Sequence, residues 1–139
     1  MSDYPITIFH NPACGTSRNT LAMIEAAGYA PTVVEYLKVG WTRPQLQDLF
    51  AAMGVTAREA MREKGTPAAE LGLLDPNVGN DRILEAMVLR PVLVNRPIVA
   101  TPKGTRLCRP SEAVLDLLDQ QPAAFTKEDG EVVGLSPVR

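Results

Sequence analysis

One cysteine stands where the chain is predicted to turn from a strand into a helix. Cys14 follows the apolar run 6–9 and precedes apolar residues at helical spacing that end at Gly28. We expect Thr16 or Ser17 to be the N-cap, because a short hydroxyl accepts a bond from an amide one turn on. A thiol at the positive end of a helix has a lowered pKa and is a thiolate nucleophile. The alternative, a buried structural cysteine, is disfavoured by the polar, glycine-containing turn.

The residues after the cysteine exclude two familiar kinds of thiol site. The sequence Cys14-Gly15-Thr16-Ser17 is C-x-x-S, so an oxidised Cys14 has no neighbouring thiol to reduce it. The reducing thiol must therefore come from another molecule. Thr20 stands where the arginine of a C-x5-R phosphatase loop would be. Arg18, one turn into the helix, either orients the loop or substrate or is a solvated helix residue.

A helix dipole alone cannot hold this thiol ionised. Lowering a thiol pKa by two units requires about 2.7 kcal/mol, whereas a helix N-terminus supplies about 0.3–1 kcal/mol. Loop amides, arginines and His10, the only histidine, are the candidates for the remainder. His10 either stabilises the thiolate, by charge or through the hydrogen bonds of the loop, or is a histidine merely packed at the end of the strand.

Three arginines are placed where they could bind an oxyanion. Arg96 precedes Pro97, Arg109 lies between Cys108 and a second proline, and Arg62 lies in the middle of the chain. A planar guanidinium offers paired donors that match a tetrahedral oxyanion. For each arginine alone, a surface salt bridge is the competing interpretation. Together they predict an anion pocket to which Arg62 is added as a lid.

Strand and helix signals separate the chain into outer parts and a helical middle. The middle, 38–90, is predicted to be all helical, with helices that open at Thr42, at Thr56 and at Asn80 or Asp81. The second of these carries Arg62 and stops at Gly65, and Pro91 ends the last one. Strands are predicted at 6–9, 32–36, 92–94, 98–101 and 105–108. The first two should be parallel and the last two an antiparallel hairpin.

This order of elements predicts an α/β, thioredoxin-like (glutaredoxin-like) mixed sheet with an all-helical insertion. We expect a single domain, 1–139, with a thioredoxin-like core of 1–37 and 91–139 and an insertion of 38–90. In this fold a cis proline often precedes the third strand, and Pro97 is at that place. A last helix should open at Arg109-Pro110-Ser111-Glu112, and 127–131 should be a solvated loop.

Composition narrows the partners and the compartment. The net charge of −2 provides no basic field for nucleic acid or for an anionic membrane. No apolar run approaches the roughly 20 residues that span a bilayer, and the N-terminus does not have the pattern of a signal peptide. We expect a cytoplasmic monomer whose two distant cysteines are free thiols and which has no metal site.

Four segments resemble one known family. Residues 10–21 resemble the active-site loop of the glutaredoxin-coupled arsenate reductases, and 95–99 and 104–112 resemble its two other signatures. Residues 125–130 are similar to the C-terminal segment of the family. The resemblance runs nearly end to end.

The resemblance implies a function and a role for each matching residue. It implies Cys14 as nucleophile, His10 as an aid to thiolate formation, and Arg62, Arg96 and Arg109 as oxyanion ligands. Arg58 is a neighbouring candidate for the place of Arg62, and Cys108 is interpreted as a packed thiol. The supporting loop residues are Asn11, Gly15, Thr16, Ser17 and Arg18.

The implied reaction is the reduction of arsenate to arsenite for arsenic detoxification. Arsenic becomes bonded to Cys14, glutathione acts as co-substrate, glutaredoxin resolves the mixed disulfide, and no cofactor is bound. Two alternatives remain. One is a related glutathione-dependent thiol reductase without an arsenate role, which should lack Arg96 and Arg109. The other is a non-enzymatic regulator, which should lack the nucleophile or carry C-x-x-C.

Overall fold

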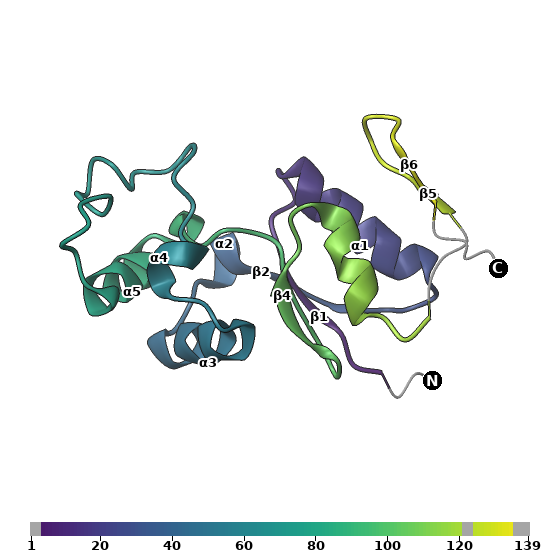
Figure 1. Cartoon of the computed structure of the whole chain (residues 1–139), viewed down its shortest axis with the longest axis horizontal. Helices are drawn as coiled ribbons and strands as arrows, with labels where there is room; N and C mark the ends of the chain where they lie inside the picture. Colours follow the sequence, from purple (N-terminus) through teal and green to yellow (C-terminus); the bar gives the residue numbers. More distant parts are fainter. Residues whose placement is uncertain (1–3, 121–123, 135–139) are drawn as a thin grey trace. The chain divides into compact units, whose positions relative to one another are not determined.

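The computed structural model describes residues 4–120 and 124–134. They divide into two compact units (Figure 1). The first, here called the sheet unit, comprises the described residues of 1–35 and 96–139, and the second, the helical unit, comprises 36–95. The residues predicted to carry out the thiol chemistry belong to the sheet unit, whereas Arg58 and Arg62 belong to the helical unit.

A four-stranded mixed sheet forms the centre of the sheet unit. Its strands are β1 (Thr7–His10), β2 (Thr32–Glu35), β3 (Ile98–Thr101) and β4 (Gly104–Leu107), in the order β2-β1-β3-β4. Strands β1 and β2 are parallel, whereas β3 is antiparallel to both β1 and β4. The predicted parallel pair and the predicted hairpin are therefore both confirmed.

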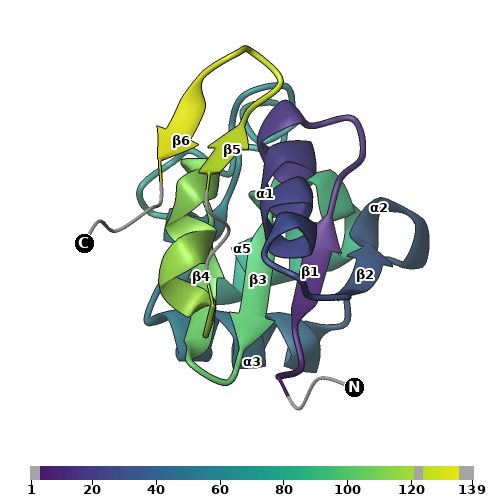
Figure 2. The ribbon, with the colours of Figure 1, turned by 90° about the vertical axis from the view of Figure 1, so that its right-hand side faces the viewer.

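Two helices cover one face of this sheet (Figure 2). They are α1 (Gly15–Ala26) and the 3-10 helix η2 (Ser111–Leu117). The last helix is thus present as predicted but is wound more tightly than an α-helix. The buried residues between sheet and helices are Ile6, Ile8, Met23, Ile24, Ala27, Val99, Cys108, Val114, Leu115, Leu117 and Leu118. Burial of a large aliphatic side chain contributes about 1.5–3 kcal/mol, so this cluster fixes the helix that begins after Cys14.

The segment 127–131, predicted to be a solvated loop, is a largely exposed turn, and it joins two strands that were not predicted. Strand β5 (Ala124–Thr126) pairs antiparallel with β6 (Val132–Gly134). The backbone N–H of Lys127 donates to the carbonyl of Glu131 at 2.8 Å, which closes the turn. The two strands were missed because strands this short carry little sequence signal.

The helical unit contains the helices predicted for the middle of the chain. The predicted ones are α3 (Arg43–Met53), α4 (Ala57–Ala60) and α5 (Asn80–Leu89). Two further short helices were not predicted: α2 (Tyr36–Val39) and the 3-10 helix η1 (Pro91–Leu93). The capping boxes that open α3 at Thr42 and α4 at Thr56 are confirmed, since each threonine accepts a backbone N–H and has its own N–H bound in return. The predicted cap of α5 is wrong: Gly79 is the N-cap, because the Asn80 side chain accepts the N–H of Ala57 at 2.9 Å.

Two further predictions for this unit, a helix that carries Arg62 and a strand at 92–94, are wrong. The backbone after α4 makes other hydrogen bonds. The helix ends at Ala60, so Arg62 is not helical, and its N–H donates to the carbonyl of Leu93 at 2.7 Å. The predicted strand 92–94 is replaced by η1, in which the N–H of Val94 donates to the carbonyl of Pro91 at 3.1 Å.

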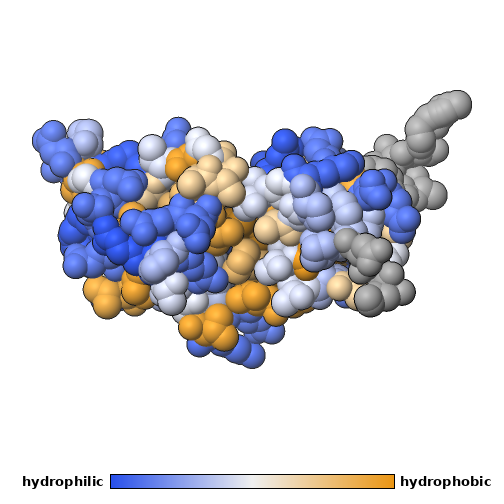
Figure 3. All heavy atoms as spheres, turned by 90° about the horizontal axis from the view of Figure 1, so that it is seen from below, coloured by the Kyte–Doolittle hydropathy of each residue, from blue (hydrophilic) through white to orange (hydrophobic). Residues whose placement is uncertain are grey.

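Polar residues predominate on the face drawn in Figure 3, and apolar residues reach the surface in small groups. Val39 and Leu89 are among the large apolar side chains left exposed. None of the helices in the described part of the chain combines the length and the apolar character needed to cross a membrane.

Arg58 holds the irregular segment between α4 and α5 in place. Its guanidinium donates to the carbonyl oxygens of Leu73 (3.1 Å), Asp75 (2.9 Å) and Val78 (2.7 Å). Hydrogen bonds from a charged donor are roughly twice as strong as neutral ones. This segment has no helix or strand to hold it, and the hydrogen bonds of Arg58 serve as its cross-links instead.

Replacing Arg58 should cost stability. We expect Arg58→Ala to lower the free energy of unfolding by about 1–3 kcal/mol, because carbonyl groups lose their partners. Urea unfolding measures the change. Arg82→Ala is the control, because Arg82 makes only an exposed contact with Glu85 at 3.6 Å. A loss no larger than that of the control would contradict the cross-linking role.

Candidate active site

Cys14 itself is the N-cap of α1. Its backbone is extended at φ −101° and ψ 122°, and the helix begins at Gly15. The preceding turn is closed by Asn11, whose side-chain oxygen accepts the N–H of Ala13 (2.9 Å) and whose carbonyl accepts that of Cys14 (3.0 Å). The prediction of Thr16 or Ser17 as N-cap is wrong, and the sulfur lies beside the free amides of the helix.

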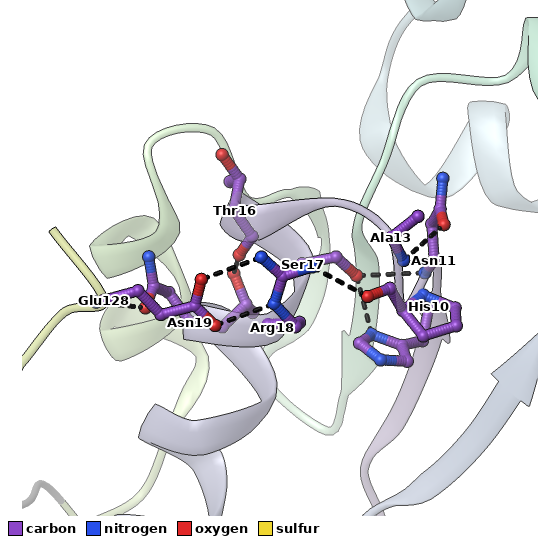
Figure 4. Close-up of polar contacts among 10 residues, drawn as sticks. His10, Asn11, Ala13, Thr16, Ser17, Arg18, Asn19 and Glu128 are labelled. Atoms are coloured by element: carbon purple, nitrogen blue, oxygen red, sulfur yellow. Dashed lines mark hydrogen bonds and ion pairs between the residues drawn. The ribbon is translucent and has the colours of Figure 1, made fainter.

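Ser17 uses its hydroxyl to fasten the strand to the helix. Its Oγ accepts the backbone N–H of Asn11 at 3.1 Å and lies 2.7 Å from Nδ1 of His10 (Figure 4). The side chain is fully buried. The backbone N–H of the same residue also lowers the pKa of the Cys14 thiol. One residue therefore connects the end of β1 to the thiol.

His10 is buried at the end of β1. Burial lowers its pKa, and the nearby charge of Arg18 acts in the same direction, whereas Glu35 and Glu25 oppose the shift. The imidazole is therefore neutral at pH 7 and adds no positive charge. Of the predicted ways in which His10 could assist the thiolate, the hydrogen bond to Ser17 is the one that the geometry supports.

Arg96 and Arg109 both reach Cys14. Nη1 of Arg109 lies 3.8 Å from the sulfur and donates to the carbonyl oxygen of Arg96 at 3.0 Å. Arg96 also acts on this sulfur, since its guanidinium lowers the pKa of the Cys14 thiol. The Arg96–Pro97 bond is cis, as predicted, and so is Arg109–Pro110. The structure thus brings together a thiol and two guanidinium groups from three separate segments.

The thiol is buried and still ionises near neutral pH. Cys14 is only 9% exposed, so the prediction that its turn would keep it out of the interior is wrong. Burial raises its pKa, but the Ser17 N–H, Arg96 and Arg109 outweigh this effect and lower the pKa to about 7. Neighbouring donors thus supply the remainder that the helix dipole cannot.

Arg18 orients the loop. Its Nε and Nη2 donate to the two carboxylate oxygens of Glu128 at 2.7 and 2.8 Å, and its Nη1 donates to the carbonyl of Pro12 at 2.8 Å (Figure 4). A Cβ added to Gly15 would lie 3.7 Å from this ion pair. Glu128 was missed by the sequence analysis, although the family-like segment 125–130 contains it.

The other predicted site residues have structural contacts of their own. The carbonyl of Thr16 accepts the hydroxyl of Thr20 at 2.8 Å within α1. In the helical unit, Nε of Arg62 donates to the carbonyl of Lys64 at 3.2 Å, and its Nη1 donates to the side chain of Asn95 at 3.4 Å.

The second cysteine is not a reactive thiol. Cys108 is fully buried, and burial raises its pKa to about 12. Both Cys14 and Cys108 are free thiols, as predicted. Within residues 4–120 and 124–134, no three His, Cys, Asp or Glu side chains are grouped so that they could hold a metal ion.

The pH dependence of alkylation should distinguish the two thiols. Because the pKa of Cys14 is about 7, its reaction rate with iodoacetamide should rise with pH, reach half its maximum near pH 7 and level off above it. Cys108 should remain silent over this range. Cys14→Ser is the control and should abolish the reaction. A midpoint near that of an ordinary thiol would contradict the proposed stabilisation of the thiolate.

Comparisons with known proteins identify one family. The model of the ArsC family matches residues 9–117. The chain is 62% identical to arsenate reductase ArsI1 of Synechocystis sp., over 96% of this chain and 93% of that protein. It is 54% identical to an arsenate reductase of Escherichia coli strain K12, over 92% of each chain.

Solved structures give the same result. An arsenate reductase from Vibrio cholerae superposes with a TM-score of 0.80 at 37% identity, covering 84% of this chain and 100% of that one. A protein from Yersinia pestis described as a possible arsenate reductase superposes with a TM-score of 0.76 at 41% identity, covering 80% and 98%. The predicted thioredoxin-like fold is confirmed, and the chain belongs to the ArsC family.

Proposed function

We propose that this protein is an arsenate reductase that converts arsenate to arsenite through Cys14, with glutathione and glutaredoxin as reductants, in arsenic detoxification. The observation that carries the proposal is a thiol with a pKa of about 7 in contact with the guanidinium groups of Arg96 and Arg109. The relatives named arsenate reductases support the choice of oxyanion.

The guanidinium groups bind the substrate. Arsenate is a tetrahedral anion, and Arg96 and Arg109 offer it charged donors beside the sulfur. Arg62 is the third ligand in this proposal. The alternative, Arg58, is already bound to three backbone carbonyls, which supports the choice of Arg62.

The first chemical step forms a bond between sulfur and arsenic. The Cys14 thiolate attacks the arsenic atom, and one arsenate oxygen leaves as water after it takes up protons. Arsenic remains pentavalent in this adduct. The arginines stabilise the negative charge on the remaining oxygens, and the lowered pKa of the thiol supplies the nucleophile near neutral pH.

The second stage transfers two electrons to arsenic. A glutathione thiolate bonds to the sulfur of Cys14, the sulfur–arsenic bond breaks, and its electron pair stays on arsenic, which leaves as trivalent arsenite. The enzyme is then a Cys14–glutathione mixed disulfide. Because Ser17 occupies the resolving position, a thiol of another molecule must reduce this disulfide, and in this proposal it belongs to glutaredoxin. Glutathione is a cytosolic reductant, so we place the reaction in the cytoplasm, with the protein as a monomer.

The two alternatives are less well supported. A thiol reductase that handles only glutathione conjugates has no need for two arginines directed at the sulfur. A regulator has no need for a stabilised thiolate. Phosphate has the same shape and charge as arsenate, and we attribute discrimination to the chemistry, because thiols reduce arsenic and do not reduce phosphorus.

Arsenite release by the purified protein tests the proposal. With arsenate, glutathione and glutaredoxin, the wild type should turn over, and Cys14→Ser should fall to background because the nucleophile is lost. Cys108→Ala is the matched control and should stay close to wild type. Severe loss in that control would make Cys108 a resolving thiol. Equal turnover with thioredoxin in place of glutathione and glutaredoxin would refute the proposed reductants.

Substitution of the arginines tests the anion site. Arg96→Lys, Arg109→Lys and Arg62→Lys should each raise the arsenate KM by about 10- to 100-fold, because lysine loses the paired donors. Unfolding by urea should change far less. Arg106→Lys is the control, since Arg106 pairs with Asp116 on the surface. Unchanged saturation by arsenate would remove the substituted arginine from the site.

A further inference from the structure

The C-terminal hairpin contacts the helix that begins at Cys14. The carboxylate of Glu128 accepts two hydrogen bonds from Arg18, at 2.7 and 2.8 Å. Its backbone N–H donates to the side-chain oxygen of Asn19 at 3.1 Å. The third contact of Arg18 is the carbonyl of Pro12, two residues before the nucleophile. Glu128 therefore reaches the catalytic loop through a single intermediate side chain.

The neighbouring residue of the hairpin contacts a different segment. Nζ of Lys127 lies 2.6 Å from a carboxylate oxygen of Glu112 and 3.3 Å from one of Glu131, and the lysine side chain is only 10% exposed. The pairing raises the pKa of Lys127 and lowers that of Glu112. Glu112 is in the first turn of η2, three residues after Arg109. Lys127 thus fixes the start of the helix that follows an oxyanion ligand.

We propose that Lys127 and Glu128 are positioning residues for the active site: Glu128 fixes the Cys14 loop through Arg18, and Lys127 fixes the Arg109 segment through Glu112. The hairpin is seated on the sheet unit by Phe125, which packs against its buried cluster. These two adjacent residues of the hairpin turn thereby set the distance between Cys14 and Arg109.

The contribution of the Arg18–Glu128 pair lies in geometry more than in stability. Arg18 and Glu128 are about half exposed, and exposed ion pairs contribute little to folding. Positioning is more demanding, because a displacement of about 1 Å can reduce a rate by about 100-fold. The Arg18–Glu128 pair should therefore affect kinetics more than stability. The largely buried Lys127 contributes to both, so urea unfolding must accompany its kinetic test.

The first test uses Glu128→Gln and iodoacetamide alkylation of Cys14. The substitution removes a negative charge, which by itself would lower the pH midpoint of the reaction. If the loop is displaced, the sulfur of Cys14 moves away from Ser17 and the arginines, and the pH midpoint of its alkylation rises. We expect this midpoint to rise. Arg18→Lys keeps the positive charge but loses the planar guanidinium, and it should raise the midpoint in the same way. The control is Asp116→Asn, which changes the acid of another surface pair.

The second test separates the two residues by their kinetics. Lys127→Met should raise the arsenate KM about tenfold and leave the alkylation midpoint unchanged, whereas Glu128→Gln should lower kcat and shift that midpoint. Lys103→Met is the matched control, since Lys103 binds only the carbonyl of Leu118 at 2.9 Å. Urea unfolding should show all variants folded.

The tests distinguish this proposal from the proposed function. Only the measurements with arsenate rest on the proposed function. If the wild type fails to reduce arsenate, the function is wrong, but the alkylation midpoint still reports on Glu128. A midpoint in Glu128→Gln that falls or stays constant overturns the role of Glu128. A KM in Lys127→Met equal to that of Lys103→Met overturns the role of Lys127.

Discussion

The sulfur of Cys14 has been taken out of water, and the site depends on the groups that replace that water. Burial alone would keep the thiol protonated. The N–H of Ser17 and the guanidinium groups of Arg96 and Arg109 compensate for the lost hydration and lower its pKa. These donors come from the first turn of a helix and from the ends of two strands. The lowered pKa of the Cys14 thiol is therefore a property of the tertiary fold and not of the loop alone.

The sheet topology explains why the donors meet. Phe9 in β1 pairs with Ile98 in β3, and Ile98 pairs with Leu107 in β4. Strand β3 is antiparallel to both neighbours. Its start therefore lies at the same end of the sheet as the ends of β1 and β4. That end of the sheet carries the Cys14 loop, Arg96 and Arg109. A parallel β3 would have carried Arg96 to the opposite end.

Local signals predicted local structure well. The hairpin of β3 and β4, the capping boxes at Thr42 and Thr56 and the strand–turn–helix around Cys14 follow from neighbouring residues. Apart from the N-cap of α1, several of the failures involve distant partners. Asn80 caps a different helix, and the apolar run 92–94 became a 3-10 turn. The pairing of Arg18 with Glu128 joins residues 110 positions apart, which no spacing rule could connect.

Ser17 shows how one position can satisfy the fold and constrain the chemistry. Its oxygen must serve both the N–H of Asn11 and the ring of His10 in a fully buried place. A thiol is a weak acceptor and would serve both partners poorly. The hydroxyl holds the loop together, but it cannot form a disulfide with Cys14. In the proposed reaction, the dependence on an external thiol therefore follows from the hydrogen bonds that hold the Cys14 loop.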